Sequence, residues 1–252
     1  MRYRNIILVL LPLVTWLFCQ AFLIKPRLFY FLVVIALFLI FFSVRYFVKR
    51  TNNRRVFMFS VPPLLFFLSM TFYSSVLSNR FWLHIVFILI AWFLFAYIKN
   101  LYDYFVNKTV DNLEKLDNFL LIGGFLTIFA TSSTLFILPA FLNWPFWAMF
   151  VVFIPVSFLL FNQFLAIKGK TWQEGGAMLL VNVAVLTEIA WVFSLLPLNF
   201  NVLGCLVAIF YYLLVVVNRL YWRNNLSLRN IKIPLILTAI VLVLLFLTAR
   251  WL

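Results

Sequence analysis

Long apolar runs, separated by short polar segments, recur along the whole chain. Each run is about 18 to 23 residues long, which is the length that a helix needs to cross about 30 Å of hydrocarbon. Nine transmembrane helices are expected, at residues 6–24, 28–47, 56–78, 81–98, 119–140, 146–166, 177–197, 202–220 and 233–250. This pattern predicts an all-α polytopic transmembrane helical bundle, a single integral membrane domain over residues 1–252 with no soluble domain.

Two segments need an interpretation of their own. The first apolar run follows MRYR, as in a signal sequence, but it is too long for one and has no small-residue cleavage site, so we expect a retained span. The longest polar segment, residues 99–118, carries four apolar side chains at near-helical spacing among mixed charges, which predicts a helix lying in the membrane interface. These side chains are Leu101, Phe105, Leu113 and Leu116.

Basic residues are unevenly divided between the two sets of loops. With the amino terminus inside, 16 of the 20 Lys and Arg residues lie on the cytoplasmic side. The outer four are Lys25, Arg27, Arg80 and Arg250. Because positive residues favour cytoplasmic loops, the amino terminus is predicted to be cytoplasmic and the carboxyl terminus outside. Most Trp and Tyr residues, Tyr97 among them, fall near predicted span ends, as in interfacial aromatic belts.

Composition excludes a soluble protein, because 67% of the residues are hydrophobic and 10% are charged. The net charge of +14 does not indicate nucleic-acid binding, since the basic residues form short collars between apolar runs and no domain-sized patch. The densest collar is expected to bind anionic lipid head groups, with docking of an acidic partner as the alternative. It consists of Arg45, Lys49, Arg50, Arg54 and Arg55. The expected location is a plasma or bacterial inner membrane.

Catalytic and metal-binding patterns are not found. The sequence has no HExxH, no paired intramembrane aspartates and no GxS-type serine with a usable histidine, so we expect no enzyme activity, no cofactor and no metal. Cys19 and Cys205 are interpreted as free apolar thiols, with a disulfide between them in an oxidising compartment as the alternative. His84, one turn below the outer interface, is interpreted either as a capping or hydrogen-bonding group or as a proton-transfer group.

One acid stands apart from this apolar background. Glu188 lies near the middle of the predicted span 177–197, whereas the other five acids lie in loops. A charge at a helix centre costs about 2.5 to 3.5 kcal/mol on insertion scales, so the group must face protein, be paired or be neutral. Its own helical face offers Val181, Ala184, Trp191 and Leu195, which bond poorly. Glu188 is therefore predicted to face another helix.

An antiparallel pairing of spans seven and eight supplies that helix. The tight turn at 198–201 places Glu188 opposite Tyr211, with Tyr212 beside it, and places Asn182 level with Asn218. Depth brings Asn162 and Gln163 to the same level. The predicted polar seam inside the bundle consists of Glu188, Tyr211, Tyr212, Asn162, Asn182 and Asn218. The seam is interpreted either as packing that holds the helices, with a protonated Glu188 donating to a tyrosine, or as a protonatable or substrate-binding site.

Prolines and small residues modify three spans. Pro155 and the sequence VPP at 61–63 remove backbone donors inside their helices and are expected to kink them. Gly123, Thr127 and Thr131 are spaced four apart, which predicts a ridge of small side chains that permits close helix contact.

The segments TEIAWVFSLLPLNFNVLG and FYYLLVVVNRLYWR resemble the carboxyl-terminal hairpin of uncharacterised multi-pass membrane proteins of bacteria with small genomes. The resemblance implies no activity. From the residues, we expect a non-enzymatic component or scaffold of a membrane or envelope assembly, with a membrane protein as partner. The alternative is a small-molecule or lipid transporter, proton-linked through Glu188.

Overall fold

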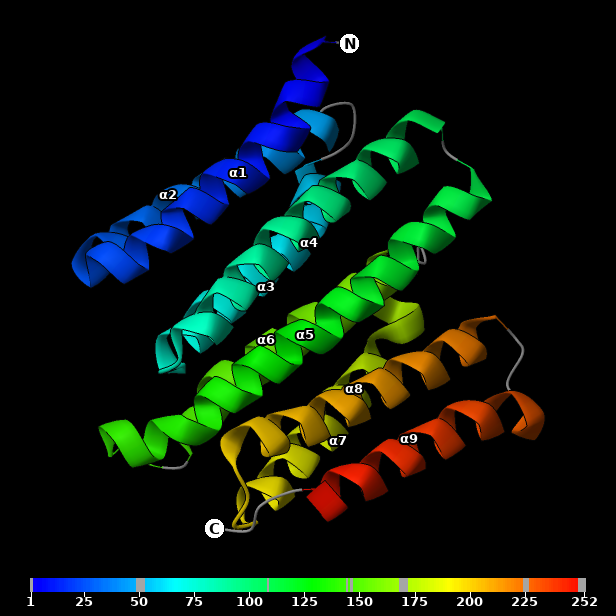
Figure 1. The fold of residues 1–252 in the computed structure, drawn as a ribbon. Helices are drawn as coiled ribbons and strands as arrows, with labels where there is room; N and C mark the ends of the chain where they lie inside the picture. The colour runs from blue at the N-terminus through cyan, green and yellow to red at the C-terminus, as the bar shows by residue number, and fades with distance from the viewer. Residues whose placement is uncertain are drawn as a thin grey trace. The chain divides into compact units, whose positions relative to one another are not determined.

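The computed structural model describes residues 2–48, 53–107, 109–143, 145, 147–167, 172–223 and 227–248. Nine α-helices occupy these ranges (Figure 1). They are α1 (Arg2–Ile24), α2 (Pro26–Val48), α3 (Asn53–Val76), α4 (Arg80–Asn107), α5 (Val110–Leu142), α6 (Ala148–Ile167), α7 (Trp172–Ser194), α8 (Phe200–Trp222) and α9 (Leu228–Thr248). All nine are long and apolar enough to cross a membrane. The predicted all-α bundle of nine spans is confirmed, and the chain is a multi-pass integral membrane protein.

The segment at 99–118 differs from its prediction. Its described residues form the last turns of α4 and the first turns of α5, with Thr109 between the two helices, and not a separate helix. Leu101 and Leu116 are fully buried. These apolar side chains therefore pack against protein, which extends both helices beyond the predicted spans. Tyr97 lies ten residues before the end of α4 and is buried in the protein.

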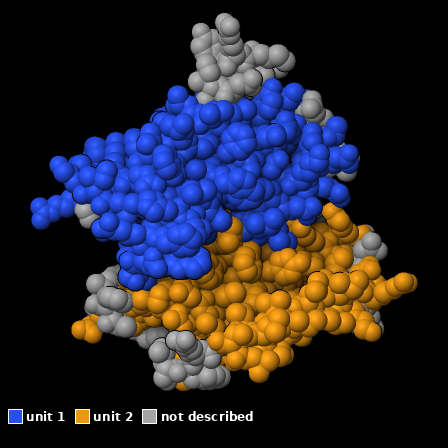
Figure 2. Space-filling model, in the orientation of Figure 1, with its two compact units in different colours: residues 1–124 blue, residues 125–252 orange. Residues whose placement is uncertain are grey.

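The described residues divide into two compact units, residues 1–124 and 125–252, so that the division falls within α5 (Figure 2). Unit 1 holds α1 to α4 with the first part of α5, and unit 2 holds the remainder of α5 with α6 to α9. The single membrane domain expected over the whole chain stays a prediction.

Stacked aromatic rings form the centre of unit 1. Phe93 of α4 stacks on Phe66 of α3 with ring centroids 3.7 Å apart, and on Phe119 of α5 at 4.8 Å. Gly123 completes this cluster, because a Cβ atom added there would lie 2.5 Å from the Phe93 ring. The predicted small residue at 123 is thus confirmed as a point of close contact. Thr127 and Thr131, the other members of the ridge, are buried.

In unit 2, α5 and α8 approach each other closely at Gly204. A Cβ atom added to Gly204 would lie 2.0 Å from the Ser133 hydroxyl oxygen, 2.9 Å from the Ser133 backbone nitrogen and 3.0 Å from the Phe129 carbonyl oxygen. The Ser132 hydroxyl donates to the Gly204 carbonyl at 3.4 Å. Only glycine permits this approach, and the contact involves backbone as well as side chains.

The hairpin of α7 and α8 is closed by an ordered turn. The Asn199 side chain accepts a hydrogen bond from the Asn201 backbone N–H at 2.9 Å, which caps α8. Leu198, Leu203 and Leu206 form a buried cluster at this end, on which Leu242, Leu245 and Phe246 of α9 pack. The rest of α9 is largely exposed, and Thr238 is its buried residue. This helix therefore adheres to unit 2 along one narrow stripe.

Candidate functional site

The buried and exposed residues of α7 separate onto two faces. Its buried residues recur three or four positions apart, from Gly175 and Leu179 through Asn182 and Leu186 to Ala190. On α8, Tyr211, Val215 and Asn218 are buried at the same spacing. These two buried faces carry Asn182 of α7 and Tyr211 and Asn218 of α8.

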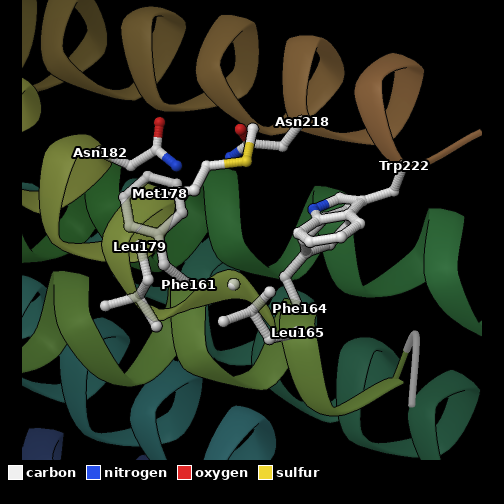
Figure 3. Close-up of a pocket in the computed structure, with 9 residues that line it drawn as sticks. Phe161, Phe164, Leu165, Met178, Leu179, Asn182, Asn218 and Trp222 are labelled. Carbon is white, nitrogen blue, oxygen red and sulfur yellow. The ribbon is translucent and has the colours of Figure 1, made fainter. Parts of the chain in front are cut away.

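Asn182 and Asn218 are brought together as predicted. Both are buried, and they line one pocket between α7 and α8 (Figure 3). The apolar part of the lining comes from α6, α7 and α8 and includes Phe161, Phe164, Leu165, Met178, Leu179 and Trp222. The space inside is about that of one water molecule. This pocket can therefore hydrogen-bond a very small ligand, and its size excludes a metabolite in this conformation.

A glycine shapes the floor of the Asn182–Asn218 pocket. A Cβ atom at Gly175 would lie 2.4 Å from Leu165 Cδ2 and 3.2 Å from the Trp222 ring. The close packing of α6, α7 and α8 at this end depends on the missing side chain. Beside the pocket, the guanidinium of Arg219 lies 5.9 Å from the centroid of the Phe164 ring, within the range of a cation–π contact.

The remaining seam residues are arranged differently from the prediction. Tyr211 is buried against Phe161, with ring centroids 5.2 Å apart and planes inclined at 51°. Tyr212 and Asn162 are half-buried and do not line the pocket. Gln163, next to Asn162, is buried instead. Fewer of the predicted seam residues are therefore buried in the interior of unit 2 than the sequence led us to expect.

Glu188, the predicted centre of the seam, is exposed. It shares its side of α7 with the exposed Val181, Ala184 and Trp191, and Leu195, directly after the end of the helix, is exposed as well. It forms no hydrogen bond or ion pair with any residue of the described ranges. The predicted shelter by Tyr211 is therefore wrong, and the functional role of Glu188 stays a prediction.

Helix phase explains this correction. At 100° per residue, six residues from Asn182 turn the helix by one full turn and a further 240°, so Glu188 points away from the direction of Asn182. The pairing argument matched depths along α7 and α8 but did not fix which way each side chain points. The helix also begins and ends earlier than the predicted span, so that Glu188 lies six residues before the end of α7 and not at its middle.

His84 is exposed in the first turns of α4. Its Nδ1 atom lies 3.4 Å from Nε2 of Gln20 in α1, a long hydrogen bond at the surface of unit 1. The α4 terminus is capped by Asn79, whose Oδ1 accepts from the Phe81 N–H at 2.9 Å. The Gln20 contact is consistent with the hydrogen-bonding interpretation of His84, and the proton-transfer interpretation stays a prediction.

The remaining groups that the sequence analysis considered are the cysteines, possible metal ligands and the basic collar. Both cysteines are free thiols. Within the part of the chain that the structure describes, no three His, Cys, Asp or Glu residues are grouped as metal ligands would be. In the basic collar, Arg45 is exposed at the end of α2, Lys49 and Arg50 lie outside the described residues, and Arg54 and Arg55 belong to the first turn of α3.

Sequence reasoning missed two features of these sites. No sequence pattern indicated the pairing of His84 with Gln20, because the two residues are far apart along the chain. The contact between Gly204 and Ser133 was weakly indicated by the sequence, since a glycine in one apolar span and a serine pair in another are typical of close helix packing.

Comparison of the chain with protein-family models, with curated proteins and with solved structures finds no match.

Proposed function

We propose that this integral membrane protein is a non-enzymatic component of a larger membrane assembly, in a plasma or bacterial inner membrane. The proposed orientation has a cytoplasmic amino terminus and an outer carboxyl terminus, as the distribution of Lys and Arg favours. The described chain is almost entirely membrane helix. Such a protein acts mainly through what it contacts within the bilayer.

The observation that carries this proposal is the exposure of Glu188 on α7. The acid lies six residues before the end of its helix, which is about 9 Å along the axis, and apolar residues surround it. A glutamate side chain is too short to reach the interface over that length. Because acids at such depth are paired or face protein in membrane proteins, a second protein is the group expected to meet it.

A carrier is supported less well. A proton-linked carrier needs its acid directed toward a path between helices, and Glu188 is directed away from the helices of unit 2. The polar pocket at Asn182 and Asn218 has room for about one water molecule. The exposure of the acid and the size of the pocket both favour the component over the carrier.

Native purification tests the proposal. The chain, purified from its own membrane in two mild detergents, is expected to retain one membrane protein at constant stoichiometry, with crosslinks identified by mass spectrometry. Proteoliposomes containing the purified chain serve as the control for transport. If the chain is recovered alone, and pH-dependent uptake is abolished by Glu188→Gln, the carrier replaces the component as the function.

A further inference from the structure

Four exposed residues of α7 and Leu195, the residue directly after the end of the helix, form one strip, which we call the Glu188 face. They are Val181, Ala184, Glu188, Trp191 and Leu195, spaced alternately three and four positions apart. The exposed fraction of the side chains is 60% at Val181, 57% at Trp191 and 71% at Leu195. The strip therefore spans about three turns of α7 and the residue after its end, and it presents one acid within an otherwise apolar surface.

We propose that the Glu188 face binds one transmembrane helix of another membrane protein, and that this helix presents a Lys or Arg side chain at the depth of Glu188. This inference rests on the proposed function, because it names the partner of the same assembly. Its basis is the complementarity of charge, size and aromatic character around the acid.

Charge complementarity selects a basic partner. Glu188 lacks a hydrogen-bond or ionic partner within the described residues, and lipid tails supply neither a donor nor a positive charge. A partner that brings Lys or Arg gains a charge-assisted hydrogen bond in a medium with little screening. Glu188 is therefore energetically unfavourable in the isolated chain, whereas in the complex it makes a specific contact.

The neighbours of Glu188 fit such a side chain. Ala184, one turn before the acid, leaves space for a second helix to approach closely. Trp191, one turn after it, presents an exposed indole ring that can lie beside a cation. The ring centroid of Phe150 in α6 lies 6.4 Å from that of Trp191, so that one side of the indole is supported by unit 2.

A second copy of the chain fits this face poorly. Symmetric dimers place the same surface patch on both sides of the contact, so that two Glu188 side chains would oppose each other. Like charges at one depth repel in a low-dielectric medium. Charge therefore favours a different protein over self-association through this face.

The test uses the purified full chain in lipid nanodiscs and a synthetic transmembrane helix as the probe. The probe is a 23-residue Leu–Ala helix with one central Arg, and the comparison peptide has Leu at that position. Wild-type protein is expected to bind the Arg helix at least about tenfold more tightly than the Leu helix, measured by fluorescence energy transfer. Glu188→Gln is expected to abolish this preference, whereas Glu174→Gln, in the first turn of the same helix, is expected to retain it.

Two further variants locate the contact. Ala184→Leu keeps the acid but fills the space beside it, and it is expected to weaken binding of the Arg helix. A photo-crosslinking residue at Val181 is expected to react with the Arg helix, while one at the exposed Val241 of α9 is not. Size-exclusion profiles and thermal unfolding of every variant show that each one folds.

Several outcomes overturn the inference. These are equal binding of the two helices by wild type, an unchanged preference in Glu188→Gln, or crosslinks from Val181 that reach only lipid or a second copy. The proposed function fails separately. If native purification yields no partner while the Arg helix still binds, the component proposal is wrong and the chemistry of the face stands. If a native partner is present but wild type shows no preference for Arg, the inference alone fails.

Discussion

The Tyr97 hydroxyl in α4 donates a 2.5 Å hydrogen bond to the backbone carbonyl of Phe59 in α3. Pro63 lies four residues after Phe59 and has no N–H, so this carbonyl lacks its usual helical donor. Tyr97 is fully buried and replaces that donor from the neighbouring helix. The carbonyl that Pro63 leaves without a helical donor is thus bonded by α4, and α3 continues through Pro63 without a break.

Tyr97→Phe is expected to lower the free energy of unfolding by about 1 to 3 kcal/mol, because it leaves a buried carbonyl without a donor. Thermal or detergent unfolding of the purified protein measures the change. Pro63→Ala restores a backbone N–H to the helix, so the cost of Tyr97→Phe should be smaller in that background. An equal cost in both backgrounds would show that the tyrosine acts by packing alone. Tyr30→Phe, at an exposed position, is the control.

Gly204→Ala is expected to destabilise unit 2 by about 1 to 3 kcal/mol, since the added methyl group collides with Ser133. Adding Ser133→Ala should recover only part of this loss. The Ser133 nitrogen and the Phe129 carbonyl oxygen remain at 2.9 Å and 3.0 Å from the new Cβ atom. Unfolding of the two variants tests this order, and full recovery would mean that the hydroxyl alone limits the approach of α5 and α8.

Asn182 and Asn218 are expected to be energetically coupled, because they line one pocket in an apolar surrounding. Asn182→Leu and Asn218→Leu should each destabilise the protein, since each leaves the remaining amide in a more apolar pocket. The double variant should cost less than the sum of the two, with a coupling of about 0.5 to 1 kcal/mol. A double-mutant cycle of unfolding measures the coupling. Strict additivity would show that the two amides act independently.

Glu188→Gln is expected to change the free energy of unfolding of the isolated protein by no more than about 0.5 kcal/mol, as at other exposed positions. A buried, hydrogen-bonded acid would cost several times as much when replaced. Unfolding in detergent therefore distinguishes the exposed Glu188 face from an internal seam. A large loss of stability in the isolated chain would indicate that the acid is sheltered within this protein.

The proposed orientation is testable with single cysteines. In a background with Cys19 and Cys205 replaced by Ala, Ser78→Cys is expected to react with a membrane-impermeant maleimide added outside intact cells. Asp111→Cys is expected to react only after the cells are opened. The reverse pattern would place the amino terminus outside. Partial labelling of both positions in intact cells would indicate two orientations.

Hydropathy predicted the nine helices because the residues of a membrane span are mostly apolar, whichever way their side chains point. The rotation of a helix about its axis is harder to infer from the sequence when nearly all sides of the helix are apolar. Asn182 and Asn218 were placed correctly because both lie on the buried stripes of their helices. Glu188 was placed incorrectly because its depth, not its direction, was inferred.

Tyr97 illustrates a second limit. Its sequence position near a predicted span end indicated an aromatic belt, but α4 continues to Asn107 and the tyrosine lies inside unit 1. The length of α4 depends on Leu101 being buried by neighbouring helices, which no local pattern reports. The function of Tyr97 as a donor to a proline-freed carbonyl also depends on contact between helices. Such contacts follow from packing and not from the order of residues in one segment.

The narrow attachment of α9 has a consequence for how the protein responds to its membrane. A helix that touches its neighbours along one stripe is free to change its tilt when the lipid bilayer becomes thicker or thinner. The buried leucines at the α7–α8 turn then act as a pivot, because the contacts of Leu242, Leu245 and Phe246 gather there. Changes in lipid chain length are therefore expected to move the Leu228 end of α9 more than the Thr248 end.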